Sequence, residues 1–210
     1  MILRAGNGSE IAAAMSNRRP YHHGDLRAQL LETVRALIEE KGPDGFSISE
    51  ASRRAGVSSA APYKHFRDKP EIMKAVAIAG MERLADRMEA AAQAKPEASL
   101  ERLSAIGKAY IDFARAEPGI FRVMFGATIH DEDPDVQRAG RRSYGILLDA
   151  VGARLGREPT DPDVLMRAYS LWTLVHGHSF LVIDDNMPSE GARPDEDAFL
   201  DQVGRQVMDG

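Results

Sequence analysis

Apolar residues recur at three- and four-residue steps along most of the chain, and this spacing predicts α-helices. The first run starts at Asp25, an expected N-cap, and stops at Gly42. A long helix is expected to begin between residues 68 and 70 and to continue through Met88. Further helices are predicted near 99–116, 118–126, 133–155, 162–184 and 195–208, separated by prolines. Because no alternating pattern exceeds a few residues, the predicted fold class is all-α.

Between the first helix and the long one, the pattern predicts two short helices joined by a tight turn. Ser47 and Glu50 have the spacing of a capping box, in which each side chain binds a free backbone N–H group of the other. The helix that they open ends before Gly56, which can adopt the left-handed geometry of a turn. Ser58 is expected to cap the second helix, from Ser59 to Phe66.

Two short helices joined in this way place the second across the first, so that its N-terminal end can enter the major groove of DNA. Pro62 lies near the start of the second helix, where a missing N–H group is expected to be least harmful. The candidate DNA-binding residues are Ser47, Ser58, Ser59, Ala60, Ala61, Tyr63, Lys64, His65 and Lys69. The last four can donate to phosphates, which positions a protein on DNA without reading its sequence.

The overall charge of -5 argues at first against a nucleic-acid partner. Its distribution is uneven, however. Residues 16–69 hold ten Lys and Arg against seven Asp and Glu, whereas residues 70–210 hold 16 against 24. A basic end on an acidic body would present one face to phosphates and keep the rest away from them.

The composition predicts a soluble cytoplasmic protein. Apolar residues make up 43% of the chain, and no apolar run approaches the roughly 18 residues that a membrane span needs. The absence of Cys excludes disulfides, thiolate metal sites and a cysteine nucleophile. Residues 1–21 predict an arm without a core of its own. This arm is either a disordered tail or start-codon extension, or a segment whose Arg18 and Arg19 reach a minor groove or phosphates.

The run Ser-Ile-Ser-Glu-Ala-Ser-Arg-Arg-Ala-Gly-Val-Ser from Ser47, followed by Tyr63-Lys64-His65-Phe66 and Lys69, resembles the signature of the TetR (tetracycline-repressor-like) family. The resemblance covers about residues 25–80. It implies that Tyr63, His65 and Lys69 contact phosphates or support the recognition helix, and that Phe66 packs that helix onto its domain. Ala61 and Pro62 depart from the family pattern, which has a larger apolar or Thr-type residue before the Tyr. Few side chains remain for bidentate base contacts, so DNA shape would carry more of the recognition.

Two runs in the second half, from Glu117 to Gly126 and from Trp172 to Gly177, resemble a TetR subgroup with a Trp-His-Gly motif, and residues 21–27 look typical of the same subgroup. After the flexible arm expected at 1–21, the resemblance implies a helix-turn-helix DNA-binding domain (22–69) and a helical effector-binding and dimerisation domain (70–210). It implies a homodimer paired through the helices at 162–184 and 195–208. Such a regulator binds double-stranded operator DNA and responds to a small-molecule effector, and family frequency favours a repressor.

Aromatic and Met side chains on the apolar faces of the second domain could line an effector cavity between helices. The alternative is that they are ordinary core residues. The candidates are Tyr110, Phe113, Phe121, Met124, Phe125, Trp172 and His176. Trp172 and His176 are four residues apart, so they share one helix face. For His176 in particular, a histidine at such a position is more often a core residue that binds a carbonyl group than a ligand contact.

Two other hypotheses are weaker. His130, His176 and His178 with Asp131, Asp133 and Asp135 suggest a metal site, but His176 and His178 are two residues apart and diverge on a helix, unlike zinc ligands four residues apart. A helical enzyme or small-molecule carrier would use the N-terminal unit only for contacts. The sequence has no nucleophile elbow, Gly-rich phosphate loop or HExxH motif, so we expect no enzyme, no metal and no cofactor.

Overall fold

The computed structural model describes residues 26–126, 133–187 and 195–209, and every regular element within these ranges is helical. The predicted all-α class is therefore confirmed. The elements are α1 (Leu26–Lys41), α2 (Ile48–Arg54), the 3-10 helix η1 (Pro62–Lys64), α3 (Lys69–Gln93), α4 (Leu100–Ala116), α5 (Pro118–Met124), α6 (Pro134–Leu155), α7 (Pro162–Ile183) and α8 (Glu196–Asp209). None of the described helices is both long and apolar enough to cross a bilayer.

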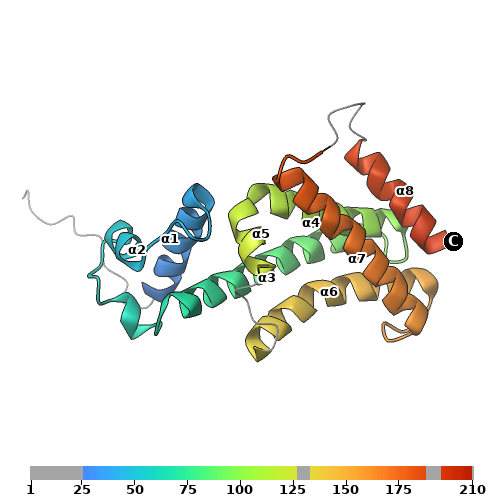
Figure 1. The fold of residues 1–210 in the computed structure, drawn as a ribbon. Helices are drawn as coiled ribbons and strands as arrows, with labels where there is room; N and C mark the ends of the chain where they lie inside the picture. The colour runs from blue at the N-terminus through green and yellow to red at the C-terminus, as the bar shows by residue number, and fades with distance from the viewer. Residues whose placement is uncertain (1–25, 127–132, 188–194, 210) are drawn as a thin grey trace, which may run out of the picture.

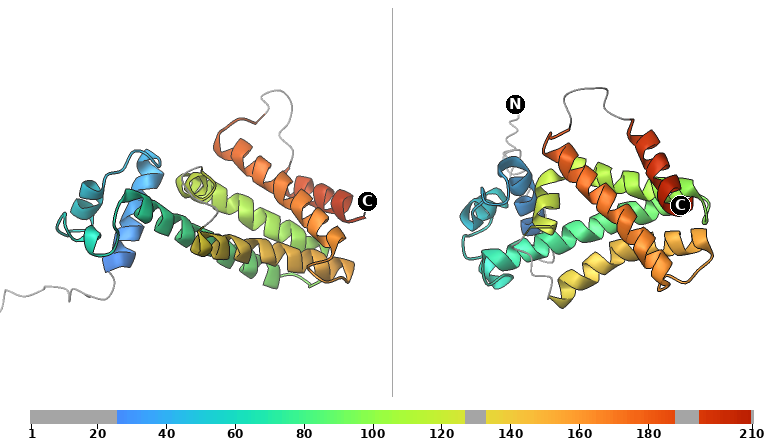
Figure 2. Two further views of the ribbon diagram at one scale, coloured as in Figure 1. Left: turned by 60° about the horizontal axis from the view of Figure 1, so that its bottom comes forward. Right: turned by 45° about the vertical axis from the view of Figure 1, so that its right-hand side comes forward.

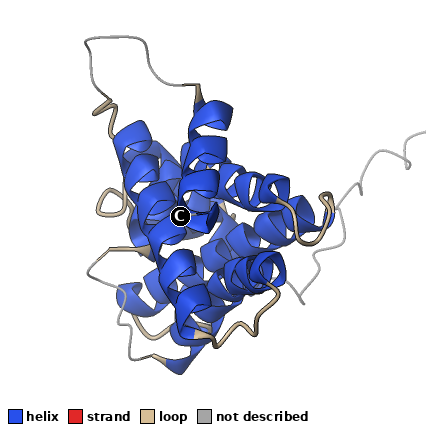
Figure 3. Cartoon of the chain, turned by 90° about the vertical axis from the view of Figure 1, so that its right-hand side faces the viewer, coloured by secondary structure: helices blue, strands red, loops and turns tan. Residues whose placement is uncertain are grey.

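The long helix α3 joins a small N-terminal unit of α1, α2 and η1 to a body that contains α4 to α8 (Figure 1). Its 25 residues span about 37 Å. In the body, α4 and α6 lie along α3, and α7 contacts both α4 and α6 (Figure 2). Helices joined by loops make up the whole described part of the chain (Figure 3). The domain boundary predicted at residue 70 falls in the first turn of α3, which continues unbroken. The two units therefore share one helix instead of a linker.

Most helices begin where the sequence predicts, because short polar side chains bind the free N–H groups of the first turn. Asp68 accepts a hydrogen bond from the backbone of Glu71 at 2.9 Å, and Ser99 accepts one from Arg102 at 3.1 Å. Asp161 caps α7 in the same way, and Pro162 follows it at a position where no N–H is needed. The predicted ends of α4 to α8 agree with the structure to within two residues. The expected cap at Asp25 lies outside the described residues.

The α-helix predicted from Ser59 to Phe66 is wrong, because only Pro62–Lys64 is helical and it forms a 3-10 turn. Counted from Ser59, Pro62 is the fourth residue, whose N–H group would make the first bond of an α-helix, and proline has none. The backbone N–H groups of Ala61 and Lys64 instead bind carbonyls three residues back, at 3.0 and 3.2 Å. The expected side-chain cap is also absent, since the carbonyl of Ser58, and not its hydroxyl, accepts the bond from Ala61.

The capping box at the start of α2 is half formed. The Ser47 hydroxyl accepts a hydrogen bond from the Glu50 backbone at 3.2 Å, as predicted. The Glu50 carboxylate instead accepts a bond from Lys41 Nζ at 2.7 Å, which connects α2 to the end of α1 and lowers the pKa of Glu50. Gly56 has φ +69°, so it adopts the left-handed geometry that the sequence predicts for the turn.

Candidate nucleic-acid interface and ligand cavity

The far end of the N-terminal unit exposes most of the predicted DNA-binding residues. Tyr63 is 59% exposed, and its neighbours Lys64 and His65 are exposed as well. Ser47, Ser58, Ser59 and Ala60 are exposed too. Ala61 differs from the expectation, because it is only 8% exposed and lies on the inner side of the turn beside the buried Pro62. Its methyl group is therefore not part of the exposed surface.

Two cation–π contacts stabilise the residues beneath the exposed turn. The guanidinium of Arg27 lies 5.2 Å from the ring centroid of the buried Phe66, the aromatic residue expected to pack the turn. Lys69 Nζ lies 4.5 Å from the Phe46 ring centroid and donates to the Phe46 carbonyl oxygen at 3.1 Å. Lys69 therefore braces the start of α3 against the loop before α2. Phe46 was missed by the sequence reasoning, since a lone aromatic residue in a turn gives no periodic signal.

The charges at this end differ in how they are paired. Arg54 makes two hydrogen bonds of 2.6 Å to the Glu40 carboxylate, so its charge is largely neutralised. Arg53 has a side chain 77% exposed and lies 3.9 Å from Glu50. Lys64 has no carboxylate partner among the described residues. Lys64 and Arg53 are the cations that this surface offers most openly to a phosphate.

A cavity of about 860 Å³ lies in the body, between α3, α4, α5, α6 and α7. Four of the predicted effector residues line it: Tyr110, Met124, Phe125 and Trp172. Phe113 and Phe121 are fully buried and belong to the core around it. Its volume falls within the range of about 300–1,000 Å³ that is typical of small-molecule sites.

His176 lies behind the cavity wall and fixes the orientation of Tyr110. The Tyr110 hydroxyl and His176 Nδ1 are 2.8 Å apart. Burial raises the pKa of Tyr110 and lowers the pKa of His176, so both side chains are neutral near pH 7. The rings of Trp172 and His176 are 5.3 Å apart, which agrees with their expected place on one helix face.

The sequence reasoning missed more than half of the lining. From α3 come Met81, Leu84 and Met88, for which the sequence predicts only an apolar helix face. The residue after Phe125, one face of α6 and one residue of α7 complete the wall: Gly126, Val136, Gln137, Gly140, Arg141, Ser143, Tyr144, Leu147 and Tyr169. Periodicity identifies such a face, but it does not say whether a neighbouring helix or an open space lies against it.

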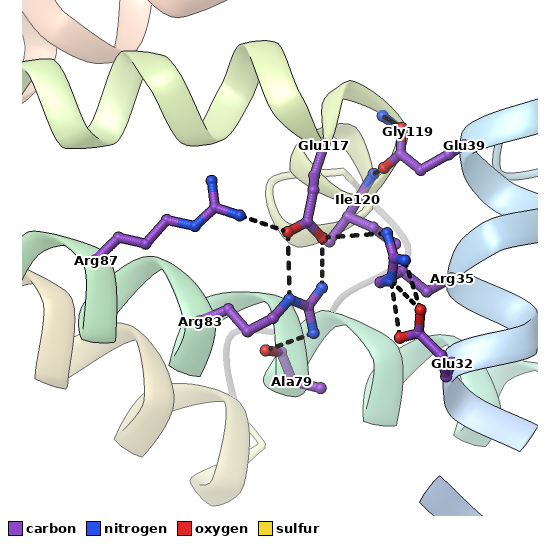
Figure 4. Close-up of polar contacts among 9 residues, drawn as sticks. All are labelled: Glu32, Arg35, Glu39, Ala79, Arg83, Arg87, Glu117, Gly119 and Ile120. Carbon is purple, nitrogen blue, oxygen red and sulfur yellow. Dashed lines mark hydrogen bonds and ion pairs between the residues drawn. The ribbon is translucent and has the colours of Figure 1, made fainter. Parts of the chain in front are cut away.

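A buried acid connects α5 to α3 at the end of the body nearest to α1 (Figure 4). Glu117, only 6% exposed, accepts bonds from Arg83 at 2.6 and 3.3 Å and from Arg87 at 3.3 Å. Arg35 of α1 lies 3.9 Å from the same carboxylate. Because its cations come from α1 and α3, Glu117 joins three helices at one point.

Few of the residues suggested as metal ligands lie close together in the described part of the chain. His178 stacks on Phe199 of α8 with ring centroids 4.9 Å apart, whereas His176 contacts Tyr110 of α4. The two histidines of α7 therefore contact different helices. His130 and Asp131 lie outside the described residues. Within the described ranges, no group of three His, Cys, Asp or Glu side chains could hold a metal ion.

Comparisons with known proteins cover both parts of the chain. Residues 30–76 match a family model described as bacterial regulatory proteins of the tetR family, and residues 103–206 match the tetracyclin repressor-like C-terminal domain. The transcriptional regulator BetI of Cronobacter sakazakii is 26% identical over 155 residues, which are 72% of this chain and 76% of BetI.

Nucleoid occlusion factor SlmA of Haemophilus influenzae is 28% identical over 114 residues, which are 54% of this chain and 52% of SlmA. The chain thus spans about half the length of this relative. A solved structure from Rhodococcus sp. RHA1, of a protein with unknown function, is 30% identical with a TM-score of 0.72, and the match covers 91% of this chain and 95% of that one. The N-terminal family model covers the exposed turn, and the C-terminal one covers most of the helices around the cavity. The chain therefore belongs to the TetR family of ligand-responsive, DNA-binding transcriptional regulators.

Proposed function

We propose that this regulator is a repressor, which leaves its operator when a small molecule occupies the cavity. The observation that supports the proposal best is the position of α5. It is fixed to α1 at one end and lines the cavity at the other. A ligand that binds better to a conformation unable to hold DNA would shift the equilibrium towards release.

The proposed DNA contacts are made by the exposed turn. Tyr63, Lys64 and His65 would donate to phosphates, while Ser58, Ser59 and Ala60 would lie against base edges. Lys69 has the bracing role, because its ammonium group is already bonded to Phe46. With so few long polar side chains at the turn, sequence selectivity would depend on DNA shape as well as on direct contacts.

The route from the cavity to the turn would run through α5. Met124 and Phe125 at its C-terminal end line the cavity. At its N-terminal end, Glu39 of α1 binds two of its backbone N–H groups. A ligand that displaces the C-terminal end would therefore move the polar junction with α1 and tilt the N-terminal unit.

The proposed dimer forms through α7 and α8. Large apolar side chains on α7 are unusually exposed for a soluble protein, including Met166 at 65%, Tyr169 at 56% and Leu181 at 45%. A two-fold pairing of these helices would place two copies of the exposed turn on one face of a duplex, with a spacing near one DNA turn of about 34 Å. The subgroup with the Trp-His-Gly motif stays a prediction.

A gel-shift titration with the DNA that flanks the gene tests the binding half of the proposal. We expect a sequence-specific, salt-sensitive shift for the wild type and at least a tenfold loss of affinity for Tyr63→Ala with Lys64→Ala. Lys95→Ala is the matched control, since Lys95 is exposed in the loop after α3 and far from the turn. Equal affinities for flanking and unrelated DNA would reject the proposal.

Deletion of the gene tests the direction of control. A repressor predicts that expression of a reporter driven by the flanking DNA rises when the gene is deleted, and a fall would identify an activator. The rival hypothesis is a helical enzyme or carrier without DNA binding. It predicts no specific shift and a co-purified cofactor or metal, which absorbance and metal analysis of the purified protein detect.

A further inference from the structure

The cavity has an uneven polarity that indicates the kind of molecule it takes. Its walls from α3, α4, α5 and α7 are formed by methionines, a leucine and aromatic rings: Met81, Leu84, Met88, Tyr110, Met124, Phe125, Tyr169 and Trp172. Its charged and amide groups all come from α6, where Gln137 and Arg141 lie one turn apart. Among the described lining residues there is no Asp or Glu.

Arg141 is unusual among the three arginines in this part of α6. Arg138 pairs with Asp135 at 2.9 Å. Arg142 pairs with three carboxylates of α3, at 2.7 to 2.9 Å: Glu82, Asp86 and Glu89. Arg141, which is exposed at the edge of the cavity, contacts only the Gln137 side-chain oxygen at 3.4 Å and no carboxylate in the described part of the chain. Most donors of its guanidinium group are therefore available to a ligand.

We propose that the cavity binds an amphipathic organic anion, with an apolar body among the methionine and aromatic side chains and one carboxylate or similar oxyanion on Arg141. This inference rests on the proposed function, in which the cavity is the effector site. The planar guanidinium group binds an oxyanion through two parallel hydrogen bonds. The side chain of Gln137 can donate a further bond from one turn away.

An organic cation is the main competitor, because rings such as Tyr144 and Trp172 could bind a quaternary ammonium group by cation–π contacts. Such a ligand would place its charge near Arg141 without an acidic side chain among the described lining residues to offset the repulsion. A cage of rings around a small cation would also fill only part of about 860 Å³. The charge of the lining thus favours an anion.

A matched pair of fluorescent probes tests the inference. Anilinonaphthalenesulfonate and phenylnaphthylamine share one ring system and differ in the sulfonate. Trp172 is the only tryptophan and lines the cavity, so quenching of its emission reports binding there. We expect saturable quenching by the sulfonate, and Arg141→Gln should raise its Kd about tenfold, as for loss of one charged hydrogen bond. The Kd of the neutral probe should stay within twofold.

Two further variants separate the possible outcomes. Arg138→Gln removes a neighbouring charge outside the cavity and should change neither Kd. Gly140→Phe adds a ring at a residue that lines the cavity and where a Cβ atom meets no atom within 4 Å, and it should abolish binding of both probes. A thermal melt of each variant confirms that it is folded.

The outcomes distinguish this inference from the proposed function. If Arg141→Gln changes both affinities equally or changes neither, the cavity remains a ligand site but recognition of an anion by Arg141 is wrong. If the wild type shows no saturable quenching, or Gly140→Phe does not alter it, the effector role of the cavity fails as well. Binding to operator DNA is measured separately and is unaffected by either result.

Discussion

Glu39 of α1 binds the backbone of Gly119 at the start of α5 (Figure 4). Its carboxylate accepts hydrogen bonds from the N–H groups of Gly119 at 3.0 Å and Ile120 at 2.9 Å. These N–H groups have no partner within a helix, and the helix dipole favours a negative charge beside them. Gly119 also allows close approach, since a Cβ atom there would lie 2.9 Å from the Ile38 carbonyl oxygen. The DNA-binding unit and the cavity thus meet through one short helix.

Glu39→Gln should weaken this connection. The amide keeps one acceptor oxygen but loses the charge and one of the two bonds, so we expect unfolding to require about 1–2 kcal/mol less free energy. Urea titration followed by circular dichroism measures the change. Glu97→Gln, at an exposed loop position, is the control. Identical midpoints for Glu39→Gln and wild type would show that the contact does not contribute.

Glu117→Gln should be more damaging than Arg87→Gln. The first removes the buried carboxylate that pairs with Arg83 and Arg87 and leaves these two guanidinium groups without it, which costs about 2–4 kcal/mol, while Arg35 keeps its ion pair with Glu32. The second removes one ion pair of 3.3 Å from a side chain 44% exposed and a cation–π contact with the Phe113 ring at 5.1 Å, which together are worth about 1 kcal/mol. Thermal or urea unfolding of the two variants ranks them. The reverse order would contradict the central role of Glu117 at the junction.

The pH dependence of the free energy of unfolding should reveal the burial of His176 beside Tyr110. Burial holds the pKa of His176 below its usual value, so the unfolded chain binds a proton that the folded protein does not. This group therefore stabilises the fold above its unfolded pKa of about 6.5, and that contribution is lost as pH falls towards the folded pKa. The free energy of unfolding should fall less steeply on acidification in His176→Asn than in the wild type. Parallel curves would place the acid sensitivity elsewhere.

Charges placed on α7 should separate the proposed dimer. Met166→Glu with Leu181→Glu would bury like charges between two copies of the helix, at a cost of several kcal/mol. We expect a monomer of about half the wild-type mass in sedimentation experiments at micromolar concentration. Lys95→Glu, a charge change away from α7, should remain a dimer. A dimer that persists in the α7 variant would place the interface on another surface.

Local signals in the sequence account for most of the helices. The caps at Asp68, Ser99 and Asp161 act within one turn, as do the prolines that follow the first and the last of them, so they can be interpreted without knowing the fold. The α-helix predicted across Pro62 is wrong because this proline falls where the first backbone hydrogen bond of so short a helix must form. Its effect therefore depends on its exact position in the helix. The left-handed turn at Gly56 has no such dependence.

The cavity was only partly predictable. Phe121 and Phe125 have the same helical spacing and chemistry, yet Phe121 is fully buried while Phe125 lines the open space. Arg141 and Arg142 are adjacent, but only Arg142 meets carboxylates of α3. The first difference depends on how α5 packs in the body and the second on how α6 packs on α3. Separate apolar patterns along the chain do not specify either.

The most direct test of the account is the affinity of the purified protein for the DNA that flanks its gene, measured by fluorescence anisotropy over a series of salt concentrations. We predict that the logarithm of Kd rises linearly with the logarithm of salt concentration. The slope should be smaller by about two for Lys64→Ala, because each of the two subunits loses one phosphate contact. Lys95→Ala should follow the wild type. Equal affinities and equal slopes for wild type and Lys64→Ala would contradict the placement of DNA on this surface.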